Sequence, residues 1–246
     1  MLLVDADIYL FRALAATEDE TDWGDDIWSL TTDLKLAKEL FFDQLDNFKD
    51  KIGDEDIILC ISSSSNFRRE VDPTYKAHRK KTRKPVGYKA MVEWASGFFR
   101  TFKKEGLEAD DCLGILATRP ENVGKCVVIS DDKDLKTIPC KLYRPMADER
   151  LTISKEDADR FFYTQCLTGD TADGYAGLKG VGPKTAEKIL GSRPVWSTVE
   201  QAFIKAGMSR EDALLQARLA RILRWEDWDS KNNKPILFNG EQANAA

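Results

Sequence analysis

The chain has 246 residues, enough for one large domain or two modest ones, and its 42% apolar and 32% charged residues are ordinary for a folded protein. This composition excludes disordered, collagen-like and coiled-coil proteins, and no apolar run reaches the roughly 20 residues of a membrane-spanning helix. The first ten residues include two aspartates and no basic leader, so we expect a soluble cytoplasmic protein without a membrane partner. The five cysteines form no Cys-x-x-Cys pair and favour buried, reduced thiols.

Short apolar strands alternate with amphipathic helices in the first part of the chain. Residues 2–4, 57–62 and 126–130 predict buried strands, and apolar periodicity predicts helices over 33–48, 88–102 and 110–117. Residues 18–26 predict an acidic surface loop. The alternation indicates an α/β fold with a central parallel sheet flanked by helices.

From about residue 154 the pattern changes to helices alone, with predicted starts at Ser154, Pro183 and Ser209. We therefore expect an α/β core over residues 1–153 and a helical subdomain over 154–229. Residues 230–246 predict a frayed tail.

Acidic residues follow two predicted strands and begin two predicted helices. In a parallel sheet the ligand site lies beyond the carboxyl ends of the strands, and a spacing of three places two acids on one side of a helical turn. So many acids in one place need cations to neutralise them, and all-oxygen ligands favour magnesium or manganese. Any single aspartate at a helix start is more often an N-cap, but the set together favours a metal site. Its candidates are Asp5, Asp7, Glu108, Asp110, Asp111, Asp131, Asp132, Asp134, Asp170 and Asp173.

A basic segment, residues 66–104, carries twelve Lys and Arg against three acids in a chain whose net charge is −5. A helix here would give one basic stripe able to bind phosphates, with Tyr75 beside it to stack on a base. The stripe consists of Lys76, Arg79, Lys80 and Arg83. Taken alone, this stretch would fit a solvated lysine-rich linker better.

The glycine hairpin, residues 177–190, combines three glycines within six residues with a helix start at Pro183. Glycines let backbone N–H groups approach a phosphate, and a helix N-terminus favours an anion. This pattern predicts a helix-hairpin-helix element that binds duplex backbone without reading sequence. A plain helix–turn–helix connection, the alternative, would not need three glycines.

Five motifs in this order resemble those of the flap-endonuclease-like 5′ nucleases: LVDAD, FRR…YKAHR, EADD, SDDKD and GDTADGYAGLKGVGPKTA. The resemblance covers residues 2–223 and is greatest to the stand-alone 5′–3′ exonucleases of short-tailed bacteriophages. The 5′ nuclease domain of bacterial DNA polymerase I is also similar. The resemblance implies a PIN-like, resolvase-like core, a basic helical arch at about residues 66–104, and a C-terminal helix-three-turn-helix subdomain.

The resemblance also implies an activity and its residues. It implies cleavage of duplex, nicked or flapped DNA from 5′ ends by a monomer with two Mg²⁺ or Mn²⁺ ions, and cleavage of RNA in RNA–DNA hybrids, in the cytoplasm of a phage host. The tighter metal site falls on Asp5, Glu108, Asp110 and Asp132, and the second on Asp111, Asp134, Asp170 and Asp173. Lys76 and Arg79 are expected to draw the scissile phosphate onto the metals. The DNA-binding set is Tyr75, Lys76, Arg79, Lys80, Arg83, Lys84, Gly180, Val181, Gly182, Lys184 and Thr185, and the hairpin glycines are expected to hold potassium.

One position departs from the family pattern. Where an aspartate usually precedes the aromatic-Arg pair, this chain has four serines, and the missing carboxylate aligns with Ser62 or Ser63. Asp7 and Asp131 are extra acids that could compensate. The rival interpretations are an inactivated DNA-binding homologue and a PIN-like ribonuclease. The remaining carboxylates argue against the first and the glycine hairpin against the second.

Overall fold

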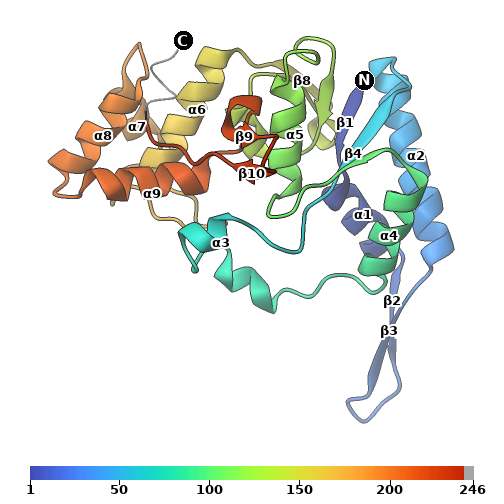
Figure 1. Cartoon of the computed structure of the whole chain (residues 1–246). Helices are drawn as coiled ribbons and strands as arrows, with labels where there is room; N and C mark the ends of the chain where they lie inside the picture. Colours follow the sequence, from blue (N-terminus) through green and yellow to red (C-terminus); the bar gives the residue numbers. More distant parts are fainter. Residues whose placement is uncertain (241–246) are drawn as a thin grey trace.

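A six-stranded sheet forms the centre of the larger part of the molecule (Figure 1). This computed structural model describes residues 1–240, except for the side chains of Lys80 and Lys81. The strand order is β5-β4-β1-β6-β7-β8, and only β8 runs antiparallel to its neighbour. The strands are β1 (Leu2–Asp5), β4 (Ile57–Cys60), β5 (Thr101–Phe102), β6 (Val127–Ile129), β7 (Lys141–Arg144) and β8 (Glu149–Thr152).

Helices cover both faces of the sheet, because side chains along the central strand alternate between two apolar clusters. Leu2 and Val4 pack with α1 (Ala6–Ala15), α2 (Leu34–Ile52) and α4 (Tyr88–Phe98). Leu3 packs on the other face with α5 (Ala109–Thr118). The prediction of an α/β fold with a central, mostly parallel sheet is confirmed.

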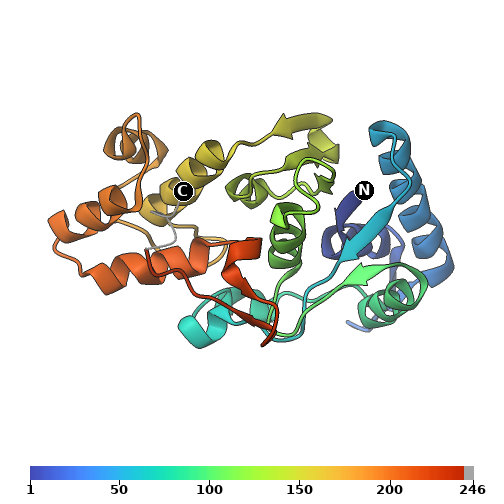
Figure 2. The same cartoon turned by 45° about the horizontal axis from the view of Figure 1, so that its top comes forward.

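The helices after residue 154 gather beside the sheet and share their own apolar cluster (Figure 2). They are α6 (Lys155–Thr168), α7 (Pro183–Leu190), α8 (Trp196–Lys205) and α9 (Arg210–Ala220). The side chains of Ser154 and Ser209 accept backbone N–H groups at the starts of α6 and α9, as N-caps do, so these two predicted starts are confirmed. We propose a division between core and helical part at residues 153 and 154.

Three expectations about local structure are wrong. The helix predicted over 88–102 ends at Phe98, because the chain then enters the edge strand β5. The predicted acidic loop begins an antiparallel β-ribbon of β2 (Glu18–Asp22) and β3 (Trp28–Thr32), which projects from the body in Figure 1. The described part of the tail also packs: β9 (Trp228–Asp229) pairs with β10 (Lys234–Pro235), and the buried ring of Phe238 lies 5.0 Å from that of Trp196.

The basic segment connects the two parts of the molecule. It contains α3 (Arg68–Val71) and the 3₁₀ helix η1 (Ala77–Lys81), and in Figure 1 it runs from beside α9 across to α4. The remaining short elements are the 3₁₀ helices η2 (Lys133–Thr137), η3 (Pro145–Ala147) and η4 (Trp225–Asp227). No helix among the described residues is long and apolar enough to cross a membrane. The five cysteines are free thiols; four of them are buried, as predicted, and Cys140 is half-buried.

Candidate active site

The predicted carboxylates meet in a cavity of about 300 Å³ at the carboxyl ends of β1 and β6. The start of α5 and the loop after α6 close the cavity from two other sides. We call this cavity the carboxylate pocket. Its acidic side chains are Asp5, Asp7, Glu108, Asp110, Asp132, Asp134, Asp170 and Asp173, and its basic ones are Lys76, Arg79 and Lys133.

Three of these carboxylates carry raised pKa values. Asp5, the last residue of β1, is 2% exposed, and burial and the nearby Asp7 raise its pKa to about 7 although Ser130 Oγ donates to it at 2.8 Å. Burial and the charges of Asp132 and Asp5 raise the pKa of Asp110 well above its usual value. Burial and the Asp132 charge raise the pKa of Asp134 to about 6. The pocket therefore concentrates more negative charge than its own basic groups offset.

Lys76 holds two of the remaining acids. Its Nζ lies 2.8 Å from Glu108 Oε1 and 3.5 Å from Asp173 Oδ2. Burial alone would raise the pKa of Glu108, but Lys76 and Arg68 together hold it at about 2. Lys76 thus supplies positive charge at the wall of the pocket that the basic segment forms.

Lys133, which lies between Asp132 and Asp134 in the sequence, also pairs with two pocket carboxylates. Its Nζ lies 2.7 Å from Asp170 Oδ2 and 3.4 Å from Asp134 Oδ1. Although partial burial opposes it, hydrogen bonding from Lys133 and the Ala172 N–H lowers the pKa of Asp170. No role was predicted for Lys133. Its position among the aspartates of the SDDKD motif could have indicated that it pairs with pocket carboxylates.

The donor set fits hard divalent cations. Every pocket acid offers oxygen, and the raised pKa values of Asp5, Asp110 and Asp134 show charge that a divalent cation would stabilise. No three His, Cys, Asp or Glu side chains among the described residues already form a preassembled metal site. The two lysines instead hold several of the carboxylates in ion pairs.

Asp111 does not belong to the pocket, which corrects its predicted role as a metal ligand. Its side chain is fully buried and accepts Arg68 Nη2 at 2.7 Å and Arg68 Nη1 at 2.8 Å. It also accepts the Leu223 N–H at 3.1 Å, and it forms a capping box with Glu108 at the start of α5. Its oxygens are thus used on Arg68 and Leu223 at the joint between core and helical part, and on the Glu108 N–H at the start of α5. Glu108 and Asp111 do lie on one side of the turn, as expected, since Arg68 Nη1 also donates to Glu108 Oε2 at 3.3 Å, but only Glu108 lines the pocket.

The predicted basic stripe is also wrong. Lys76, with φ of 52°, precedes the short helix η1 and turns its amine into the pocket, and Arg79 Nη2 lies 3.0 Å from Asp173 Oδ1. Arg83 lies beyond the helix and bonds Glu18 of the β-ribbon, with Nη1 3.0 Å from Oε2. Lys84 Nζ lies 4.1 Å from the centre of the Tyr88 ring. The side chain of Lys80 lies outside the described residues.

Tyr75 is not available to stack on a base. Its side chain is 2% exposed, and its hydroxyl donates to either Glu108 Oε2 at 3.0 Å or Asp173 Oδ2 at 3.1 Å. The ring packs in the apolar cluster of the helical part. Tyr75 instead supports two carboxylates of the pocket from behind.

Of the two serines expected to replace a carboxylate, Ser62 lines the carboxylate pocket and Ser63 does not. Its Oγ accepts the Ala109 N–H at 2.9 Å, and its own N–H donates to Asp7 Oδ2 at 3.2 Å. Ser63 instead bonds Glu105 outside the pocket. Asp7 thus lies beside the serine, whereas Asp131 turns away and bonds Arg12.

In the glycine hairpin, the three glycines have different roles. A Cβ at Gly177 would lie 2.3 Å from the Gly169 backbone nitrogen, and the Gly177 N–H donates to Gln216, so this glycine serves close packing and not phosphate binding. Gly180 has φ of +78° in an exposed turn, which favours glycine. The other predicted contacts lie at the same end of α7: Val181 is half-buried, and Gly182, Lys184 and Thr185 are exposed.

Comparison with known proteins gives one family and a consistent fold. Residues 1–158 match the model of the 5′-3′ exonuclease N-terminal resolvase-like domain. The exodeoxyribonuclease of Enterobacteria phage T3 is 32% identical, with 97% of this chain and 92% of the phage protein covered. The exonuclease of Escherichia phage T7 is also 32% identical, covering 97% and 93%. The structure of the bacteriophage T5 flap endonuclease with DNA and metal ions matches with a TM-score of 0.62 at 15% identity, covering 89% of this chain and 88% of that one.

Proposed function

Because the chain belongs to the 5′–3′ exonuclease family, it is a metal-dependent nuclease acting on DNA, and we propose that the carboxylate pocket is where it hydrolyses the phosphodiester bond. The observation that supports this proposal most is the convergence on one cavity of acids from the end of β1, the start of α5, the segment after β6 and the loop after α6. That cavity lies at the carboxyl edge of a parallel sheet, where such folds bind ligands. The products would carry 5′-phosphates.

We assign two groups of ligands for two Mg²⁺ or Mn²⁺ ions. When bound, the ions would stabilise the attacking and leaving oxygens of the displacement. The first group is Asp5, Glu108, Asp110 and Asp132, and the second is Asp134, Asp170 and Asp173. Asp111 is left out because Arg68 and the Leu223 N–H occupy its oxygens.

The basic residues at the pocket act on the phosphate. Lys76 and Arg79 already lie at the pocket wall, and both bond Asp173. A DNA phosphate that enters the pocket offers these two side chains an alternative anionic partner, so they draw the scissile phosphate toward the carboxylates and stabilise charge that develops on it. Asp5 and Asp132 complete the set of residues that we propose as catalytic.

DNA on either side of the scissile phosphate is held by two other surfaces. The exposed turn and first residues of α7 present backbone and Lys184 to a duplex phosphate, in the manner of a helix N-terminus. The basic segment supplies Arg83 and Lys84 nearer to α4. We propose duplex, nicked or flapped DNA as substrate, RNA in RNA–DNA hybrids as a further one, a monomeric enzyme, and potassium at the hairpin of residues 180–182.

The test is a cleavage assay with end-labelled nicked duplex DNA, an RNA–DNA hybrid, single-stranded DNA and single-stranded RNA, each in magnesium and in chelator. We expect shortening of the nicked duplex from its 5′ end in magnesium and none in chelator. Cleavage of single-stranded RNA alone would favour the PIN-like ribonuclease. Binding of the nicked duplex without cleavage in either magnesium or manganese would favour the inactivated homologue.

A further inference from the structure

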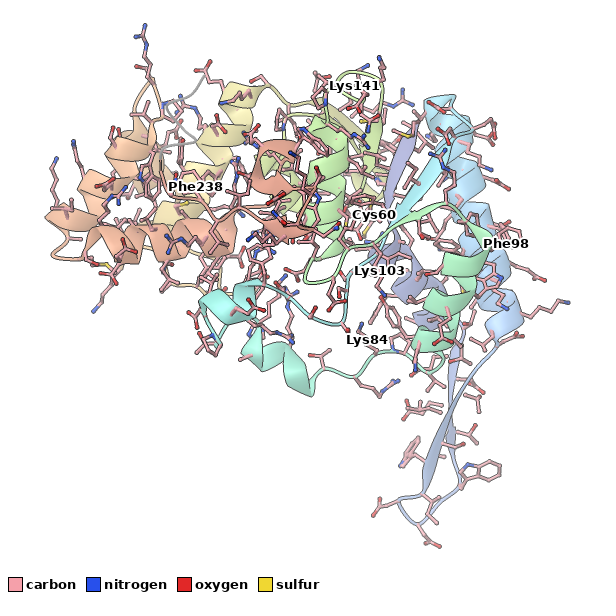
Figure 3. The ribbon with its side chains drawn as sticks, viewed as in Figure 1. Cys60, Lys84, Phe98, Lys103, Lys141 and Phe238 are labelled. Carbon is pink, nitrogen blue, oxygen red and sulfur yellow. The ribbon has the colours of Figure 1, made fainter. Side chains whose placement is uncertain are left out.

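A second cavity, of about 860 Å³, adjoins the carboxylate pocket on the side of α4. Asp7 and Ser62 line both cavities, so these two residues form the boundary between them. We call the second cavity the lysine groove. Its basic side chains are Lys84, Lys89 and Lys103, and its aromatic one is Tyr88. Figure 3 labels Lys84, which precedes α4, and Lys103, which follows β5.

The walls of the lysine groove combine the two chemistries that a nucleotide needs. Tyr88 and Val92 offer an aromatic and an apolar surface to a base or sugar. The three lysines outnumber the two acids of the lining, Asp7 and Glu93, so the groove has a positive excess, unlike the carboxylate pocket.

The boundary between the two cavities is less acidic than the family pattern predicts. Ser62 occupies the position of the usual carboxylate, and its Oγ accepts the Ala109 N–H. The Asp7 carboxylate accepts hydrogen bonds from the Ser62 N–H at 3.2 Å and from the Tyr88 hydroxyl at 3.1 Å. A nucleic-acid strand leaving the carboxylate pocket therefore passes one neutral serine and one carboxylate that already has two donors.

The direction of the strand follows from the proposed function, on which this inference rests. The glycine hairpin lies in the helical part and α4 on the far side of the sheet, as Figures 1 and 2 both show. If the hairpin holds the duplex that remains, the strand continues past the scissile phosphate toward α4 with its 5′ end. We propose that the lysine groove binds the 5′-terminal nucleotide, with its aromatic wall against the base and Lys103 facing the 5′-phosphate.

Two neighbouring lysines provide a matched test. Lys103 lines the groove, whereas Lys104 does not line it and bonds Asn233 Oδ1 at 3.2 Å. Both Lys103→Ala and Lys104→Ala are compared with the wild type on two nicked duplexes that differ only in a 5′-phosphate or a 5′-hydroxyl at the nick. The measurement is kcat/KM on each duplex, with the melting temperature as a check on folding.

We expect the wild type to prefer the 5′-phosphorylated duplex by roughly threefold to fivefold, as one solvent-exposed lysine–phosphate contact allows. Lys103→Ala should remove most of this preference, and Lys104→Ala should keep it. A wild type without preference, a Lys103→Ala variant that keeps it, or an equal reduction in both variants would overturn the groove proposal while cleavage itself still supported the nuclease. Absence of wild-type cleavage on both duplexes would instead refute the proposed function.

Discussion

Two neighbouring regions of this molecule are built from carboxylates and basic side chains, but one has an excess of acids and the other pairs each basic group with an acid. In the carboxylate pocket eight acids meet three basic residues, and burial with mutual repulsion raises the pKa of Asp5 to about 7. Behind it, three buried arginines are each matched by a carboxylate, in a group that we call the arginine joint. Its ion pairs are Arg68–Asp111 at 2.7 Å, Arg221–Asp227 at 2.8 Å and Arg224–Asp159 at 2.7 Å.

Charged side chains are present in both regions, so it is the balance between acidic and basic groups that distinguishes the binding site from the structural one. The joint pairs each arginine with a carboxylate and so has no excess of charge to attract an ion, whereas an excess of carboxylates is stabilised by cations from outside. The border between the two regions runs between adjacent residues of α5. Asp110 faces the pocket and Asp111 faces Arg68.

The largest effect is expected from breaking the pocket at Asp132. Asp132→Asn should reduce cleavage of nicked duplex roughly 10³-fold, because removal of one charged group from a charge-stabilising site costs this order of rate. The matched control is Asp131→Asn, since Asp131 bonds Arg12 outside the pocket. Normal turnover by Asp132→Asn, measured in magnesium with the wild type in parallel, would show that the pocket is misassigned.

A large effect on stability is expected from breaking the arginine joint. Asp111→Asn leaves Arg68 buried with a weakened partner and should lower the free energy of unfolding by about 3 kcal/mol. Asp110→Asn, one residue away, relieves repulsion and should not lower it. Both are measured by denaturant unfolding in chelator, and equal destabilisation of the two variants would remove the distinction between pocket and joint.

An intermediate effect is expected at Lys76, which belongs to the pocket wall. Lys76→Ala should lower kcat on nicked duplex roughly 10²-fold with little change in DNA affinity, since its largely buried amine acts on one phosphate. Lys35→Ala on α2, whose side chain is 88% exposed, is the control. A decrease confined to affinity would place Lys76 among residues that only bind DNA.

The smallest effect is expected at the glycine hairpin, where interactions with DNA are exposed and screened. Lys184→Ala should weaken duplex binding and reduce the slope of log K against log salt by about 0.9, because one DNA phosphate is no longer neutralised by the protein. Turnover at saturating DNA should stay unchanged. Lys188→Ala, one turn further along α7, should leave the slope as it is, and an equal change in both variants would mean that the start of α7 has no special role in binding the duplex.

Sequence alone was sufficient for the parts of this site that follow from strand order. The aspartates after β1 and β6 had to meet because parallel strands end at one edge, and the family resemblance identified the same motifs. The sequence could not predict that the Asp111 side chain points away from the pocket, because this orientation depends on a hydrogen bond from Arg68, which lies 43 residues earlier in the chain. Spacing alone treats both acids of a capping box as equivalent.

Other misses have similar causes. Strand β2 is acidic and has no apolar alternation, and the predicted loop ended at residue 26, before the alternating β3, so the antiparallel pairing of the β-ribbon was missed. Tyr75 is an aromatic residue beside basic ones, which favours a stacking role, but the fold buries its ring against the helical part. The stripe over residues 76–83 assumed an α-helix, whereas the chain forms a short 3₁₀ helix and then leaves it.

The central claim, that the carboxylate pocket binds divalent cations, is tested most directly by Mn²⁺ titration calorimetry on the wild type and on Asp110→Asn, with Asp131→Asn as control. We expect the wild type and Asp131→Asn to bind Mn²⁺ alike and Asp110→Asn to bind at least one ion fewer. Indistinguishable Mn²⁺ binding by Asp110→Asn and the wild type would contradict this claim.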